Sequence, residues 1–276
     1  MSKKGELGKT AKVTATSTKT TINLSWSPVT GADGYAVFVK NKGSWKKLGA
    51  TKKTSYTVKK LSEGKRYTFA IRACKLKNGK VSLAKNYTSF TAATKTKRPS
   101  SLSASQTPST VTLSWSAVKN ADGYRLYRKT SSGWTKVSTT TKTRLTVKEL
   151  SSGKNYTFGV RACIKTDSGM VWSDVKSIRT ATAPKAPKLT VSDVNNLRAT
   201  IHWDKVKGAD GYQVYYKVND AESYTHLANY AATDVGVFLS RLTYGARYTF
   251  AVRAYKNAGD DIIYGPYKTV KITAVY

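Results

Sequence analysis

The chain has 276 residues and a formal net charge of +33, from 48 basic and 15 acidic side chains. That length exceeds one typical sandwich domain and suits two or three domains of roughly 100 residues each. With 39% hydrophobic and 11% aromatic residues, the chain can build packed cores, which excludes general disorder. It contains no run of about 18 apolar residues, so the sequence predicts no membrane insertion.

Three copies of one unit of about 88 residues follow one another along the chain. The first shared feature is a tryptophan that ends a short alternating segment: Trp26, Trp115 and Trp203. The second is a Tyr-Thr-Phe segment that begins at Tyr67, Tyr156 and Tyr248. The distance from the tryptophan to this tyrosine is 41 residues in the first two copies and 45 in the third. We place the four extra residues of the third copy in the loop region 219–235.

Each copy has the pattern of short β-strands. Ile22, Leu24 and Trp26 alternate with polar residues, which is the period of a half-buried strand. The segment 67–73 alternates in the same way, and glycines interrupt the chain about every 8 to 12 residues. No helical pattern lies between these strands. The sequence therefore predicts an all-β fold with one sandwich of about seven strands for each copy.

Proline-containing segments separate the copies, at 96–99 and 183–187. Proline has no backbone N–H for a ladder and stiffens the chain, so these segments are short, semi-rigid linkers. The predicted domains are 1–97, 98–183 and 184–276, arranged as an elongated array. We expect each domain to fold independently, with small and polar contacts between neighbours.

Two motifs point to a known family. Gly34-Tyr35 follows the turn after Trp26, and the pattern Leu-x-x-Gly-x-x-Tyr runs from Leu61 to Tyr67 and recurs in both later copies. These features resemble the fibronectin type III family, in the form common in bacterial secreted and surface proteins. The resemblance implies three immunoglobulin-like sandwiches, each with a buried tryptophan and a buried corner tyrosine whose hydroxyl bonds backbone upstream. It implies nothing about a ligand, because this fold serves many functions.

The sequence contains no constellation typical of catalysis. His202 and His226 have no counterparts in the other copies and are predicted to be surface residues. Asp33, Asp122 and Asp210 recur once in each copy, in a turn, and we interpret them as Asx-type turn formers. Phosphate loops, zinc-ligand spacings and nucleophile elbows are absent. The prediction is a protein that is not an enzyme, with no catalytic residue, cofactor or metal site.

The two cysteines, Cys74 and Cys163, occupy the same position in the first two copies. One cysteine in each domain cannot form a bridge within that domain, and short linkers resist the fold-back that a bridge between domains would need. We expect both thiols to be free.

The positive charge falls along the chain. Residues 1–97 carry 22 basic and 3 acidic side chains (+19), residues 98–183 carry 14 and 4 (+10), and residues 184–276 carry 12 and 8 (+4). The resulting field attracts an acidic polysaccharide, a cell-wall polymer or an acidic protein surface, including other virion or surface proteins. Lysine acts as a point charge and no nucleic-acid-reading motif is present, so sequence-specific nucleic-acid binding is not indicated.

A candidate binding face can be placed on each copy, because the segments 34–40 and 67–73 are neighbouring strands in this family. The residues of this face are Phe38, Lys40, Trp45, Lys46, Lys47 and Arg72 in the first copy, Tyr127, Lys129, Trp134 and Arg161 in the second, and Tyr215, Lys217, Tyr224 and Arg253 in the third. Two interpretations stay open. The face is either a cation–π ladder that stabilises the sheet, or a repeated docking face for sugars or polyanions.

The sequence favours a non-catalytic structural and adhesive module. In this interpretation it is an elongated spacer of a bacterial extracellular or cell-surface protein that attaches to anionic or glycan surfaces. The segment Met1 to Lys9 lacks the apolar centre of a signal peptide, so we expect the sequence either to be a piece of a longer protein or to need no such peptide. The second case suits the alternative function, a decoration or fibre protein of a bacteriophage virion, because virions assemble in the cytosol.

Overall fold

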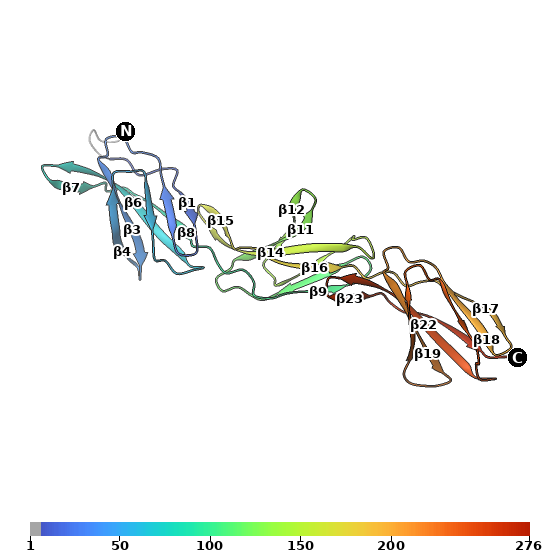
Figure 1. Cartoon of the computed structure of the whole chain (residues 1–276). Coiled ribbons are helices and arrows are strands. Elements are labelled where there is room, and N and C mark those ends of the chain that lie inside the picture. Colours follow the sequence, from blue (N-terminus) through green and yellow to red (C-terminus); the bar gives the residue numbers. More distant parts are fainter. Residues whose placement is uncertain (1–6) are drawn as a thin grey trace.

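The computed structural model describes residues 7–276, which form three β-sandwiches in an elongated row (Figure 1). The first sandwich contains β1 (Thr14–Ser17), β2 (Ile22–Ser25), β3 (Gly34–Asn41), β4 (Ser44–Thr51), β5 (Ser55–Val58), β6 (Arg66–Lys77), β7 (Lys80–Leu83) and β8 (Thr88–Ala93). The second contains β9 (Leu102–Gln106), β10 (Val111–Trp115), β11 (Gly123–Thr130), β12 (Gly133–Thr140), β13 (Arg144–Val147), β14 (Asn155–Thr166), β15 (Gly169–Trp172) and β16 (Lys176–Ala181). The third contains β17 (Leu189–Asn195), β18 (Arg198–Trp203), β19 (Gly211–Val218), β20 (Thr225–Ala231), β21 (Gly236–Leu239), β22 (Arg247–Ala258), β23 (Asp261–Tyr264) and β24 (Lys268–Thr273). The predicted all-β class and the three tandem sandwiches are confirmed.

Each sandwich packs a three-stranded sheet against a five-stranded sheet. In the first, β1-β2-β5 faces β4-β3-β6-β7, and β8 also pairs with β6. The twelve-residue strand β6 pairs with β8 along its first half and with β7 along its second half. The last of the seven expected strands is therefore split into two segments. The interruption spans residues 84–87 in the first sandwich, 173–175 in the second and 265–267 in the third.

A buried tryptophan lies in each core, as the alternation predicts. Trp26, Trp115 and Trp203 are only 5%, 5% and 3% exposed. Each ring lies 5.3 to 5.5 Å from the ring of the tyrosine that follows the next turn: Tyr35, Tyr124 and Tyr212. The hydroxyl of that tyrosine accepts a backbone N–H bond six residues upstream, from Val29, Val118 and Val206 at 2.8 to 2.9 Å. The core tyrosine of each sandwich therefore also fixes, through its hydroxyl, the turn that leads into the five-stranded sheet.

The corner tyrosines form the hydrogen bonds that the family resemblance implies. The hydroxyls of Tyr67, Tyr156 and Tyr248 accept the backbone N–H of Ser62, Ser151 and Thr243 at 2.9, 3.0 and 3.1 Å. The corner tyrosines were expected to be buried near the cores; Tyr248 is buried, whereas Tyr67 and Tyr156 are half-buried. Their rings stack on the buried Phe69 and Phe158, while their hydroxyls reach exposed backbone at the rim of the sandwich.

The four extra residues of the third copy lie between β19 and β20. This connection covers residues 219–224, whereas the corresponding hairpin of the first copy has only Lys42 and Gly43 between its strands. The longer loop is held to β22, because Asn219 Oδ1 accepts the Arg247 N–H at 3.0 Å and Asp220 pairs with the Arg247 guanidinium at 3.2 Å. The insertion thus falls within the predicted region and extends one hairpin.

Neighbouring sandwiches meet through the same two turns at both junctions. At the first, Asn120 Nδ2 donates to Gly64 O at 2.9 Å, and Arg66 Nη2 donates to Asp122 Oδ2 at 2.6 Å. At the second, the positions of Gly64 and Asn120 are taken by Gly153 and Gly208, whose backbones approach so closely that a Cβ at Gly153 would lie 2.9 Å from Gly208 O. The first junction is polar, and the second is a close contact of two glycines.

The tryptophan of the second core can be tested directly. We expect Trp115→Ala to lower the free energy of unfolding of the second sandwich by about 3–5 kcal/mol, because a large cavity replaces the indole. Hydrogen exchange followed by mass spectrometry measures each sandwich separately. Trp134→Ala is the matched control, because this indole is 41% exposed in the same sandwich, and its cost should be less than half as large. Equal costs would contradict the core position of Trp115.

The independence of the domains also remains a prediction. We expect residues 98–183 alone to unfold in one cooperative transition, because the cluster around Trp115, Phe158 and Val160 is built from that segment alone. Calorimetry of the fragment measures the transition. A fragment without a cooperative transition would show that neighbouring sandwiches share their stability.

Candidate functional site

Most of the candidate residues of the first sandwich lie on the outer face of its five-stranded sheet. Opposite residues in the ladders share a face, and the pairs are Phe38 with Lys47, Lys40 with Trp45, and Ala36 with Arg72. Lys46 is different, because it lies opposite Val39 and therefore on the other side of the hairpin. Its inclusion in the candidate face was wrong, since adjacent residues of a strand point to opposite faces.

The equivalent residues of the other two sandwiches lie on the same outer face. In the second, Lys129 lies opposite Trp134, and Tyr127 lies opposite Gly159. Gly159 and Arg161 are two residues apart in β14 and therefore share the outer face. In the third, Tyr215 lies opposite Ala251 and Gln213 opposite Arg253. Tyr224 precedes β20, and Lys217 Nζ lies 5.4 Å from the centre of its ring. Each five-stranded sheet thus carries one aromatic and basic cluster.

A half-buried arginine lies in the middle of each cluster. Arg72 Nε donates to Ala84 O at 2.8 Å, and Arg161 Nε donates to Ser173 O at 2.6 Å. Both acceptors begin the interruption of the last strand, so the arginine satisfies a carbonyl that the ladder leaves free there. In the third sandwich, Arg253 Nε instead donates to Gln213 Oε1 at 3.0 Å. These arginines hold the sheet edge, in addition to carrying charge.

Tyrosines that the sequence analysis did not single out cover two of these arginines. Arg253 lies 3.7 Å from the ring of Tyr264 and 4.7 Å from that of Tyr267, in addition to 5.5 Å from the candidate residue Tyr215. Arg72 lies 5.8 Å from the ring of Tyr87, which also meets Trp45 edge-on at 5.8 Å. The first and third clusters therefore have the geometry of the cation–π interpretation.

The missed tyrosines lie at the interruption of the last strand. Tyr87 and Tyr267 each come immediately before the final strand segment, after an interruption of four residues in the first sandwich and three in the third. This difference in length hides their equivalence in a comparison by fixed spacing. Counting backward from the final strand of each copy would have found them.

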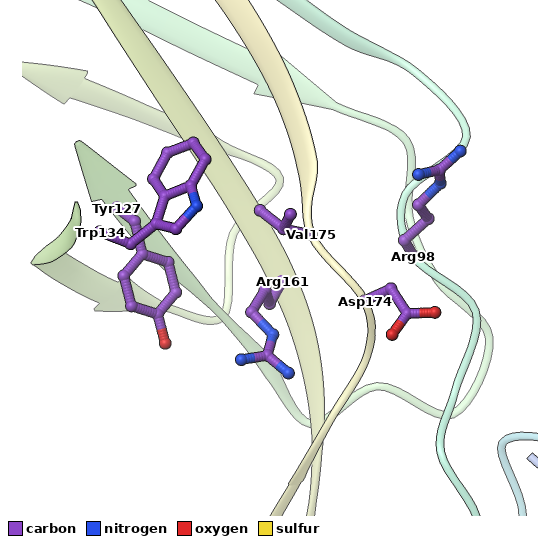
Figure 2. Close-up of a pocket in the computed structure, with 6 residues that line it drawn as sticks. All are labelled: Arg98, Tyr127, Trp134, Arg161, Asp174 and Val175. Carbon is purple, nitrogen blue, oxygen red and sulfur yellow. The ribbon is translucent and has the colours of Figure 1, made fainter. Parts of the chain in front are cut away.

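The second sandwich has Val175 at the position of Tyr87 and Tyr267. The smaller side chain leaves a hollow of about 530 Å³, shown in Figure 2. Its lining residues are Arg98, Tyr127, Trp134, Arg161, Asp174 and Val175. In Figure 2, Tyr127 and Trp134 lie on one side of Arg161, and Asp174 and Arg98 lie on the other.

Gly159 forms the floor beneath the indole of Trp134. A Cβ at this position would lie 2.7 Å from Val175 Cγ2 and 2.9 Å from Trp134 Cζ3. The first and third sandwiches have alanine at this position, Ala70 and Ala251. Glycine therefore lets the indole lie directly on the backbone of β14 in the second sandwich alone.

The repeated turn aspartates do not form the expected local turns. Their carboxylates accept backbone N–H bonds from the far strand: Asp33 from Leu76 at 2.7 Å, Asp122 from Lys165 at 2.6 Å and Asp210 from Asn257 at 2.8 Å. The Asx-turn interpretation was wrong because these partners lie 43 to 47 residues away in sequence. Each aspartate fastens the turn before the larger sheet to the second half of the long strand.

The carboxyl of Asp210 has a further partner, since Lys256 Nζ lies 2.8 Å from Asp210 Oδ1. Burial alone would raise the pKa of this carboxyl, but the hydrogen bonds from Lys256 and Asn257 and the ammonium charge hold the pKa below its usual value. The aspartate therefore stays ionised at neutral pH and acts as a structural clamp.

Cys74 and Cys163 are free thiols, as expected. Burial raises the pKa of both, and the neighbouring carboxylates of Asp33 and Asp122 raise it further. The reactive thiolate is thus disfavoured at neutral pH. These positions are typical of packing cysteines.

Residues 7–276 contain no group of three or more histidine, cysteine, aspartate or glutamate side chains arranged to hold a metal ion. Within the same residues, no helix has the length and apolar character needed to cross a membrane.

The fold and these clusters define a tandem array of immunoglobulin-like sandwiches with one aromatic and basic face on each. The family model for the fibronectin type III domain matches residues 9–84, 97–177 and 182–266. The chain belongs to the fibronectin type III family, whose domains are generally non-catalytic.

Among curated proteins, the chain is similar to exoglucanase B of Cellulomonas fimi, with 31% identity over 88% of this chain and 23% of that protein. It is 28% identical to human receptor-type tyrosine-protein phosphatase H over 87% of this chain and 22% of that protein. It is 29% identical to chitinase A1 of Niallia circulans over 64% of this chain and 26% of that protein. The chain thus spans about a quarter of the length of these relatives.

The chain is also similar to solved structures of tandem fibronectin type III domains. The crystal structure of the chicken CNTN1 FN1–FN3 domains has 21% identity and a TM-score of 0.37, covering 99% of this chain and all of that one. The two-domain fibronectin type III segment of chicken tenascin has 23% identity and a TM-score of 0.40, covering 64% of this chain and 99% of that one.

The contribution of the tyrosine rings to stability can be measured by comparing Arg253, which lies near three rings, with Arg161, which within residues 7–276 does not. We expect Arg253→Gln to destabilise the third sandwich by about 1–2 kcal/mol more than Arg161→Gln destabilises the second, because only Arg253 loses contacts with three rings. Hydrogen exchange of the full chain reports the two sandwiches separately. Equal losses would show that the tyrosines contribute nothing to the position of the arginine.

Proposed function

We propose that the chain is a non-catalytic spacer and adhesive module of a bacterial extracellular or cell-surface protein, and that it attaches to anionic or glycan surfaces. The observation that carries this proposal is the uneven charge, +19 on residues 1–97 against +4 on residues 184–276. A field of this kind attracts polyanions over distances comparable to the screening length, about 8–10 Å at physiological salt.

The lysines of the first sandwich are available for such contacts. Lys40, Lys42, Lys46 and Lys47 are all exposed on or beside the β3–β4 hairpin. In residues 7–276, the basic side chains of this sandwich form two ion pairs, Lys19 with Glu63 and Arg66 with Asp122. Most of its positive charge is thus left to interact with external groups.

The relatives support a setting beside sugar polymers. Two of them are bacterial proteins named as an exoglucanase and a chitinase, and this chain matches about a quarter of each. A rigid row of fibronectin type III domains is suited to hold other parts of a protein at a distance from a surface. The basic first sandwich then supplies the attachment.

The charge gradient is tested by two variants with equal charge loss. We expect K40Q/K42Q/K46Q/K47Q in the first sandwich to weaken binding to immobilised polygalacturonate more than K185Q/K188Q/K205Q/K207Q in the third. All eight lysines are exposed, so neither variant should lower the melting temperature much. Arg72 is left intact because it holds the Ala84 carbonyl. Surface plasmon resonance at several salt concentrations gives the affinity of each variant.

Wild-type affinity should fall steeply with salt, because exposed charges are screened. Equal losses in the two variants, or binding that persists in molar salt, would reduce the basic charge to a solubility feature and contradict the proposal.

A further inference from the structure

We infer that the hollow on the second sandwich binds one acidic sugar unit, a pyranose ring that carries a carboxylate. This inference rests on the proposed function, because it names the ligand class and the residues that would recognise it. In the other two sandwiches, a tyrosine ring stands at the position of Val175. Tyr87 and Tyr267 place a six-membered ring beside the arginine of their clusters, and Val175 leaves that space open.

The open space has a flat apolar wall. Trp134 is 41% exposed, and its Cζ3 and Cη2 atoms lie within 3.0 Å of where a Cβ at Gly159 would stand, so the indole is held against β14 while much of it stays exposed. The equivalent Trp45 is half-buried and meets Tyr87 edge-on. Flat aromatic rings in shallow hollows suit the apolar C–H face of a sugar ring. Trp134 is thus the stacking platform of the hollow.

The open space also has a positioned cation. Arg161 is anchored through Nε to Ser173 O at 2.6 Å, so its terminal nitrogens are oriented by that bond. In the part of the chain that the structure describes, no ring lies within cation–π range of Arg161, and the nearby Trp172 ring lies 4.1 Å from Arg125 instead. Arg98, from the segment between the sandwiches, adds a second guanidinium to the lining. Guanidinium groups bind carboxylates through paired hydrogen bonds.

Asp174 favours a sugar over an aromatic side chain as the occupant. Its exposed carboxylate lies in the same lining as Arg98 and Arg161 and can only accept hydrogen bonds when ionised. A ligand that matches both kinds of group must offer an anion to the arginines and hydroxyl donors to the aspartate. An acidic pyranose carries both on one ring, whereas a phenyl or indole ring offers no such set.

The experiment uses the full chain and a short oligogalacturonate as the probe, with a neutral cello-oligosaccharide of equal length for comparison. Titration calorimetry gives the affinity, and the indole N–H resonances report which tryptophan is contacted. We expect a shift of the Trp134 resonance with the acidic probe. Val175→Tyr should weaken binding about tenfold, because it places in the hollow the ring that the other sandwiches carry. Val235→Tyr, the same change at an exposed valine of the third sandwich, should leave binding unchanged.

A second variant guards against misfolding of the first. Arg161→Lys keeps the positive charge but removes the paired donors, and we expect it to weaken binding of the acidic probe severalfold. Because it also removes the bond to Ser173 O, the affinity is measured well below the melting temperature of the variant. Wild-type affinity in Val175→Tyr, or equal affinity for the neutral probe, would overturn the assignment. An equal shift of Trp134 with phenyl phosphate would assign the hollow to an aromatic ring and overturn the sugar assignment.

Failure here is distinguishable from failure of the proposed function. Polyglutamate carries charge without sugar rings, so its binding tests the basic field alone. Val175→Tyr could retain full affinity for the oligogalacturonate while the four-lysine variant of the first sandwich loses its binding to polyglutamate. That result would show that the hollow is not the sugar site, and it would leave the electrostatic attachment supported.

Discussion

Each sandwich depends on one twelve-residue strand, β6, β14 or β22, which pairs with three other strands. One strand pairs with its middle part on one edge, and the two segments of the last strand share the other edge. The inward side chains of the twelve-residue strand, such as Phe69 and Ile71, are fully buried in the core. The corner tyrosine stands near its start, and the turn aspartate is bonded to its second half. Because the side chains of a strand alternate, the same pairing that buries the core also turns an arginine to the outer face. Core and candidate site are therefore two sides of one element.

That arginine shows how a repeated framework can yield different surfaces. The framework bond from Nε to the interrupted last strand is the same in the first two sandwiches. The difference lies in one neighbouring side chain, tyrosine in the first and valine in the second. A tyrosine ring completes a cation–π contact, which stabilises the sheet modestly and covers the guanidinium. A valine leaves the guanidinium and the adjacent indole uncovered by a third ring, which is the opening on which the proposed sugar site depends.

The charge and the hollow act at different ranges. Exposed lysines on the first sandwich attract any polyanion, with little selectivity, and their effect is screened by salt. The hollow on the second sandwich offers an indole, two guanidinium groups and a carboxylate within one small lining. Such convergence of apolar and polar groups discriminates among ligands by shape and hydrogen bonding. In the proposed function, the basic field brings the chain to a surface and the hollow selects a sugar unit on it.

The repeats and alternation in the sequence were enough to determine the all-β class, the three sandwiches and the buried tryptophans, because these depend on patterns within one strand or turn. The hydrogen bonds of the corner tyrosines were expected from the resemblance to the fibronectin type III family. The sequence could also have excluded Lys46, since it and Lys47 are adjacent in one strand. Only the tertiary structure decided that Tyr87, Val175 and Tyr267 are equivalent, and that the turn aspartates bond a strand more than forty residues away. The physical reason is that the period of a strand is set by consecutive residues, whereas cross-strand register and the position of an interruption are set by pairing between segments distant in the chain.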